Sequence, residues 1–253
     1  MSNKGKVAVV TGATGGIGFQ VAKRLCEDGY TVVMNGIDDE AGNERLKELK
    51  DAGHDAEYRG FDVTNENEVS EHIKAVGEKY GRIDVLVNNA GGLGGRMRFE
   101  EMTTDFYRKV MALNLDSVFF TSRAAIPYLK NGDHPSIINY TSNAAWNAGG
   151  PGAGIYGTSK AGVHAITRAL AKDLAEYGIR VNAVSPGTID TPFHQQIKST
   201  KPEVFASWAN NIMLGRLGQP EDVSGVVSFL ASKDASFITA ETVQIGGGQA
   251  LGI

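Results

Sequence analysis

The sequence of 253 residues contains a single cysteine, Cys26. One cysteine excludes an intramolecular disulfide bond and a zinc site built on several thiolates. The five histidines include no pair at metal-binding helical spacing, so we expect no metal ion. No run of 18 apolar residues is present, so we expect no membrane-spanning helix. The formal net charge of −4 gives no electrostatic reason to expect a nucleic acid or an anionic membrane as a partner.

The start of the chain lacks the layout of a signal peptide, because Met1 to Lys4 lead directly into an apolar segment. Together with the low cysteine content, this predicts a reduced, cytoplasmic protein. Glycine, in contrast, is abundant at 32 residues, and its placement indicates where a ligand binds.

Apolar segments of strand length alternate with amphipathic segments of helix length along most of the chain. This alternation predicts an α/β fold in which helices cover both faces of a parallel sheet. We expect one doubly wound domain over residues 1–253, with a less regular substrate-loop segment at 192–218. Strands are expected at 6–10, 31–35, 56–61, 83–87, 136–140, 179–184 and 242–245, and helices at 16–28, 40–51, 66–79, 103–130, 155–177 and 219–232.

A glycine-rich loop separates the first expected strand from the first expected helix. Glycines lack a Cβ, so the backbone can approach a pyrophosphate closely, and the unpaired N–H groups of the helix N-terminus attract its charge. A strand before the loop and a helix after it are the context that a dinucleotide site requires. The residues expected to bind the cofactor here are Gly12, Thr14, Gly15, Gly16, Ile17 and Gly18.

The spacing of this loop is TGxxxGxG, and with it the sequence resembles the short-chain dehydrogenase/reductase family. The resemblance extends through Asn88-Asn89-Ala90-Gly91, Asn114, Ser142, Tyr156-Gly157-Thr158-Ser159-Lys160 and Pro186-Gly187. It implies a Rossmann-type sheet of seven strands in the order 3-2-1-4-5-6-7. It also implies reversible hydride transfer between NAD(P) and a ketone or secondary alcohol, and a homotetramer. The expected tetramer contacts are helices 103–130 and 155–177 and the segment from Gly246 to Leu251.

Tyr156 and Lys160 are four residues apart on an expected helix, so they share one face. An ammonium group about 6 Å away would lower the pKa of the tyrosine by roughly two units, into the range of a general acid. Ser142 follows the fifth strand and can hydrogen-bond the reacting carbonyl oxygen. Ser142 lies fourteen positions before Tyr156, where the family often has thirteen, so Thr141 stays an alternative. By resemblance, Lys160 binds ribose hydroxyls and Asn114 holds a water that links Lys160 to solvent.

The segment after the second strand favours NAD over NADP. Asp38 lies 20 residues after Gly18, and the loop from Asn35 to Glu40 has three acids and no base to meet a 2′-phosphate. The family pattern places Gly36 at the customary acidic position, so NADP stays open. By resemblance, further cofactor contacts are Asp62 and Val63 near adenine, Asn89, Ala90 and Gly91 after the fourth strand, and Pro186, Gly187, Ile189 and Thr191 on the nicotinamide side.

The segments expected to line the substrate pocket are polar, and guanidinium groups suit a carboxylate. We therefore expect a small keto-acid or a uronate-type keto-sugar as the substrate. A 3-oxoacyl-carrier-protein reductase is the alternative, because the pattern resembles those enzymes too. A cofactor-binding regulator without turnover and an epimerase or dehydratase of the extended branch are more distant alternatives. The expected substrate residues are Arg96, Ser142, Trp146, Asn147 and His194, and Arg98 lies close to them in sequence.

Overall fold

A computed structural model describes residues 3–249 of the chain. Its seven strands form one parallel sheet, and the order β3-β2-β1-β4-β5-β6-β7 confirms the expected topology. Registered pairs such as Val9 with Val33 align the central strands, so their carboxyl ends lie at one edge of the sheet. The strands are β1 (Val7–Val10), β2 (Thr31–Gly36), β3 (Ala56–Gly60), β4 (Val85–Asn88), β5 (Ser136–Tyr140), β6 (Arg180–Pro186) and β7 (Thr242–Ile245).

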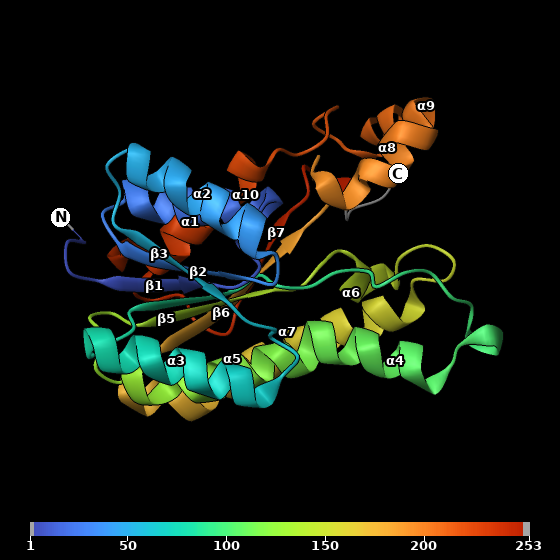
Figure 1. Cartoon of the computed structure of the whole chain (residues 1–253). Helices are drawn as coiled ribbons and strands as arrows, with labels where there is room; N and C mark the ends of the chain where they lie inside the picture. The colour runs from blue at the N-terminus through green and yellow to red at the C-terminus, as the bar shows by residue number, and fades with distance from the viewer. Residues whose placement is uncertain (1–2, 250–253) are drawn as a thin grey trace.

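Helices cover both faces of the sheet in two layers (Figure 1). One face carries α1 (Gly16–Glu27), α2 (Asp39–Asp51) and α10 (Pro220–Ala231). The other face carries α3 (Glu66–Tyr80), α5 (Ser117–Leu129) and α7 (Gly154–Leu174). Short helices α8 (Gln195–Thr200) and α9 (Pro202–Ser207) stand beyond the sheet edge, on the side of α1 and α10.

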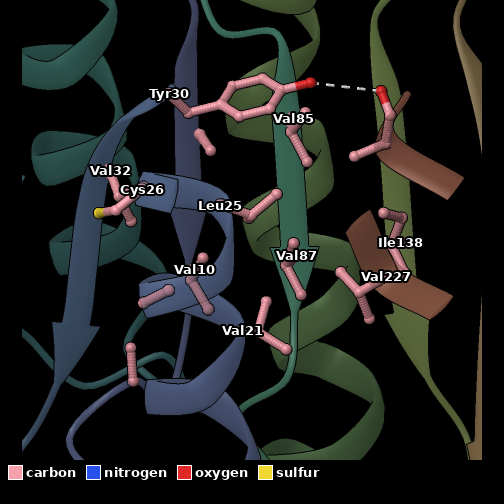
Figure 2. Packing of buried hydrophobic residues seen from close by; sticks show 14 of the residues in the cluster. Val10, Val21, Leu25, Cys26, Tyr30, Val32, Val85, Val87, Ile138 and Val227 are labelled. Carbon is pink, nitrogen blue, oxygen red and sulfur yellow. Dashed lines mark hydrogen bonds between the residues drawn. The ribbon is translucent and has the colours of Figure 1, made fainter. Parts of the chain in front are cut away.

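Buried aliphatic side chains fill the space between the sheet and each helix layer. Figure 2 shows Val21 and Leu25 of α1 beside Val10 of β1 and Val87 of β4, and all four are inaccessible to solvent. Burying such a side chain stabilises the fold by about 1.5–3 kcal/mol. The sheet edge is therefore a rigid base for the loops that leave it.

The expected long helix at 103–130 is divided. Helix α4 (Thr104–Met111) passes into a π-helical turn at Ala112–Asp116, which α5 then continues. An inserted wide turn is seldom visible in apolar periodicity, and such turns are frequent at functional sites. A one-turn helix, α6 (Ala144–Asn147), was also not expected, because four residues are too few to show a period.

The remaining expected elements agree with the structure to within one or two residues at their ends, except that α7 ends at Leu174 and a 3-10 turn covers Ala175–Tyr177. Segment 192–218 holds α8 and α9 with short 3-10 turns, in keeping with its irregular pattern. In the described part of the chain, no helix is long and apolar enough to cross a membrane. Ala250 and Leu251 of the segment expected at a subunit contact lie outside the described residues, as do Met1 and Ser2.

Candidate active site

A cleft of about 630 Å³ opens at the carboxyl ends of β1, β4, β5 and β6. Segment 192–211 closes it on the outer side, where Phe193, Trp208 and Asn211 face the cleft. This is the edge at which doubly wound sheets bind their ligands. Most of the expected site residues line it: Gly12, Thr14, Gly15, Gly16, Ile17, Gly18, Asn89, Gly91, Arg96, Ser142, Asn147, Tyr156, Lys160, Pro186, Gly187, Ile189, Thr191 and His194.

The glycine loop is shaped by close backbone contacts. A Cβ on Gly18 would lie 2.1 Å from the carbonyl oxygen of Gly12, and Gly12 itself has a φ of +63°. The amide of Asn89 donates to the carbonyls of Thr11 (3.0 Å) and Gly12 (2.9 Å), which joins the loop to the end of β4. Helix α1 begins at Gly16 without a side-chain cap, and its first residues line the cleft, so the N-terminus of this helix fits a pyrophosphate.

Lys160 lies on α7, one turn after Tyr156, and both side chains line the cleft. Its ammonium donates to the carbonyl oxygen of Tyr140 at 2.8 Å, and the side chain is 4% exposed. Thr141 also lines the cleft, but its hydroxyl donates to the backbone oxygen of Lys160 at 2.8 Å. Ser142, whose hydroxyl lies beside the Tyr156 phenol, is thus better placed than Thr141 to contact a substrate oxygen.

Burial controls the ionisation of both groups. It raises the pKa of Tyr156, and a hydrogen bond with Ser142 opposes this rise. It lowers the pKa of Lys160 to about 8. The expectation that Lys160 brings the Tyr156 pKa down to the neutral range is therefore not what this structure shows. The expectation considered only the attraction between the two charges, whereas desolvation disfavours the charged form of each.

Asn114 occupies the π-helical turn and is fully buried. Its amide nitrogen donates to the carbonyls of Gly92 and Val110, both at 2.9 Å, and its oxygen accepts from the N–H of Gly92 at 2.9 Å. A Cβ on Gly91 would lie 2.8 Å from the Asn114 oxygen and 3.0 Å from the Lys160 nitrogen. Asn114 therefore fixes the loop after β4 beside Lys160 without facing the cleft itself.

Arg96 stands at the substrate end of the cleft. Its guanidinium donates to the carbonyl of Pro151 at 3.0 Å, and the neighbouring Met97 N–H donates to Gly152 at 3.0 Å. These bonds join the loop after β4 to the glycine-rich loop that precedes α7. The extra residue between Ser142 and Tyr156 is accommodated in that loop, where Ala148, Gly149 and Gly152 have positive φ angles.

His194 belongs to an aromatic cluster on segment 192–211. Its ring lies 4.9 Å from Phe193, 5.9 Å from Phe205 and 5.2 Å from Trp208, measured between ring centroids. Burial lowers the pKa of His194, and Asp190 opposes this shift. His194 lines the cleft, and this shift favours the neutral form of its imidazole.

Several expected site residues lie outside the cleft lining. Trp146 is half exposed and packs edge-on against His164 at 5.0 Å, so the structure does not place it in the substrate pocket. Asp38 caps α2 by accepting from the Ala41 N–H at 3.0 Å. Asp62 accepts from Thr64 in a local turn. Arg98 is exposed, and Val63 and Ala90 are also absent from the lining.

Gln249 is a cleft residue that sequence reasoning placed only at a subunit contact. Trp208 and Asn211 were missed as well, because segment 192–218 has no periodic pattern that would indicate its inward-facing side chains. Gln249 reaches the cleft because of the path of the chain after β7. The sequence there shows only a run of glycines, which does not predict that path.

The site combines an anion-binding loop with an adjacent phenol, ammonium group and hydroxyl group. This combination of groups defines a dinucleotide-dependent oxidoreductase. A family model described as enoyl-(acyl carrier protein) reductase matches residues 12–250. The 3-oxoacyl-(acyl-carrier-protein) reductase of Thermotoga maritima is 37% identical over 252 residues, covering 98% of this chain and 99% of that protein. The (S)-acetoin-forming diacetyl reductase of Staphylococcus aureus is 38% identical, covering 96% of this chain and 97% of that protein.

Among solved structures, the NADH-dependent reductase A1-R′ responsible for alginate metabolism superimposes with a TM-score of 0.87. It is 36% identical, and 97% of each chain is covered. The chain belongs to the short-chain dehydrogenase/reductase family, as the sequence motifs predicted. It is an oxidoreductase that acts on the CH–OH/C=O couple with NAD(P).

Proposed function

We propose that this enzyme reduces the carbonyl of a small, polar, anionic substrate, a keto-acid or a uronate-type keto-sugar, with NADH. The observation that carries the proposal is the charge of the cleft. Among its described lining residues, Arg96 and Lys160 are the cationic side chains, and no lining residue is a carboxylate. Lys160 is engaged at the cofactor end, so Arg96 is the cation available to a substrate carboxylate.

The chain supports this reaction as follows. A bound nicotinamide would supply the hydride to the substrate carbonyl carbon. Tyr156 donates its proton to the carbonyl oxygen as negative charge develops there, and its raised pKa keeps the phenol protonated at neutral pH. Ser142 hydrogen-bonds the same oxygen. Lys160 binds the backbone at the end of β5, and Asn114 holds the loop after β4.

The preference for NADH follows from the groups near the end of β2. Asp38 and Asp39 lie at the N-terminus of α2, and the hydroxyl of Tyr58 binds the Gly36 and Asp38 carbonyls. The glycine loop has no lysine or arginine. A 2′-phosphate at this place would meet negative charge without a cation to balance it.

We also propose a homotetramer. Phe237 is fully exposed, and Phe229 on α10 is nearly half exposed. Exposed apolar side chains of this size favour contact with another protein surface. Light scattering tests the assembly: a mass of four chains supports it, and a monomer mass contradicts it.

A substrate panel tests the function. We would compare NADH oxidation with uronate-type keto-acids, neutral diketones and 3-oxoacyl thioesters, for the wild type, Arg96→Ala and the matched exposed variant Arg98→Ala. We expect Arg96→Ala to raise KM for anionic substrates about 10- to 100-fold and to leave neutral ketones unaffected. A similar loss on neutral ketones would indicate damage to the loop held at Pro151, and fastest turnover of acyl thioesters would favour the carrier-protein alternative.

A further inference from the structure

A short segment after β7, Gly246–Gln249, folds back against the cleft. Gly247 and Gly248 have φ angles of +57° and +88°, and the N–H of Gln249 donates to the Gly246 carbonyl at 2.9 Å. Such angles are readily reached only by glycine. We call this segment the C-terminal hook; it delivers the Gln249 side chain to the cleft wall.

Both ends of the Gln249 amide bind one residue, Thr188. The amide oxygen accepts from the Thr188 N–H at 2.9 Å, and the amide nitrogen lies 2.9 Å from the Thr188 hydroxyl. A Cβ on the preceding Gly187 would lie 2.6 Å from the same amide oxygen, so the two chain segments are in direct contact. Thr188 lines the cleft in the loop that we assign to the nicotinamide side.

The same amide oxygen also reaches the residue after Ser142. Asn143 donates to it at 3.4 Å, and the side-chain oxygen of Asn143 is buried without a donor in the described structure. The hook also contacts the chain just after segment 192–211, because the N–H of Leu214 donates to the Gly247 carbonyl at 3.1 Å. The hook therefore joins two walls of the cleft, the Gly187–Thr188 loop and Asn143.

We propose that Gln249 is a positioning residue that holds the Gly187–Thr188 loop and Asn143 at a fixed separation. This separation aligns the nicotinamide with the substrate carbonyl for hydride transfer. The inference rests on the proposed function, since it assigns this loop to the nicotinamide. Because NADH binding depends on the position of this loop, loss of the two neutral hydrogen bonds to Thr188 corresponds to about a tenfold change in the NADH dissociation constant.

The test measures NADH affinity by fluorescence, together with kcat, KM and thermal stability. Gln249→Met keeps the length of the side chain and removes its amide, and Gln244→Met, at the exposed glutamine of β7, is the matched control. We expect about a tenfold weaker NADH Kd and a lower kcat for Gln249→Met, an unchanged control, and recovery to within about threefold in Gln249→Glu, which keeps an acceptor for Thr188. If Gln249→Met does not fold, Thr188→Val, which removes the hydroxyl contact and keeps the Thr188 N–H bond, must show a smaller loss of NADH affinity in the same direction, and no loss would overturn the proposal.

Unchanged NADH affinity and kcat in Gln249→Met would overturn the proposal, as would an equal loss in the control. Adding Thr188→Val to Gln249→Met must cost little more than Gln249→Met alone, because the amide that binds the Thr188 hydroxyl is already gone; full additivity would also contradict the proposal. NADH affinity is read without substrate. An enzyme that binds NADH tightly but turns over no keto-acid would refute the proposed substrate and leave the hook intact.

Discussion

The ammonium nitrogen of Lys160 lies 5.9 Å from the centre of the Tyr156 ring, and it donates to the backbone of β5 rather than to the phenol. The two groups therefore interact through space, inside a site whose burial disfavours the charge of each. Carbonyl reduction needs the protonated phenol of Tyr156 and alcohol oxidation needs its phenolate, so we expect the rates of the two directions to change with pH in opposite ways.

The first prediction concerns that pH dependence. Because burial raises the pKa of Tyr156, the phenol is protonated at neutral pH and can act as the acid of carbonyl reduction. We expect kcat for reduction to be nearly constant from about pH 6 to 8 and to fall in alkaline solution, whereas alcohol oxidation, which needs the phenolate, becomes faster as pH rises. Initial rates in both directions measure this, and an oxidation rate that is highest at pH 6 would refute the assignment of Tyr156.

A second prediction concerns stability. Lys160 has a pKa lowered to about 8 from 10.5, so between these values the folded chain binds fewer protons than the unfolded chain, and stability rises with pH. Below pH 8 the buried charge destabilises the fold. We expect Lys160→Met to abolish activity yet to be more stable than the wild type by about 2 kcal/mol at pH 7, with the difference shrinking toward pH 10.

Urea unfolding at pH 7 and pH 10 measures the effect, and exposed Lys172 on the same helix offers the control Lys172→Met. A Lys160→Met protein that is less stable than the wild type at pH 7 would show that the hydrogen bond to Tyr140 outweighs the cost of burying the charge.

A third prediction concerns Asn114, which makes three hydrogen bonds within 2.9 Å. Asn114→Ala removes them and leaves buried backbone groups unpaired, so we expect a loss of about 2–3 kcal/mol in unfolding free energy together with a lower kcat. Chemical denaturation and steady-state kinetics measure the two effects. The exposed Asn67→Ala serves as the control, and equal stability losses in both variants would contradict the positional role of Asn114.

A fourth prediction concerns cofactor choice. Asp38→Asn keeps a good helix cap for the Ala41 N–H and removes one negative charge. We expect kcat/KM with NADPH to rise several-fold and that with NADH to fall, at unchanged thermal stability. Asp51→Asn, at the opposite end of α2, is the charge-matched control. An unaltered NADH-to-NADPH ratio in Asp38→Asn would show that this carboxylate does not face the ribose.

Much of the fold could be predicted from sequence, because strands rich in β-branched residues and amphipathic helices have recognisable apolar patterns. The same apolar side chains pack together in the folded protein. The strand order and the gathering of the glycine loop, Ser142, Tyr156 and Lys160 at one sheet edge follow from that alternation and the family motifs. The π-helical turn at Asn114 could not be predicted, because one extra residue per turn barely changes the period.

The details of the site depended on packing that a sequence does not display. Trp146 is an aromatic residue in a catalytic loop, yet its ring turns to His164 on the neighbouring helix. Gln249 reaches the cleft only because three glycines reverse the chain after β7. The pKa of Tyr156 was misjudged for a similar reason, since a spacing of four residues gives the distance to Lys160 but not the burial around both groups.

The most direct measurement is the rate of carbonyl reduction by Tyr156→Phe, with cofactor affinity determined in parallel. The phenylalanine ring fills the same space and lacks the proton that the account assigns to the reaction. We expect kcat to fall by about 10²–10⁴-fold while NADH still binds within a few-fold of the wild type. A Tyr156→Phe enzyme that turns over at the wild-type rate would contradict the account.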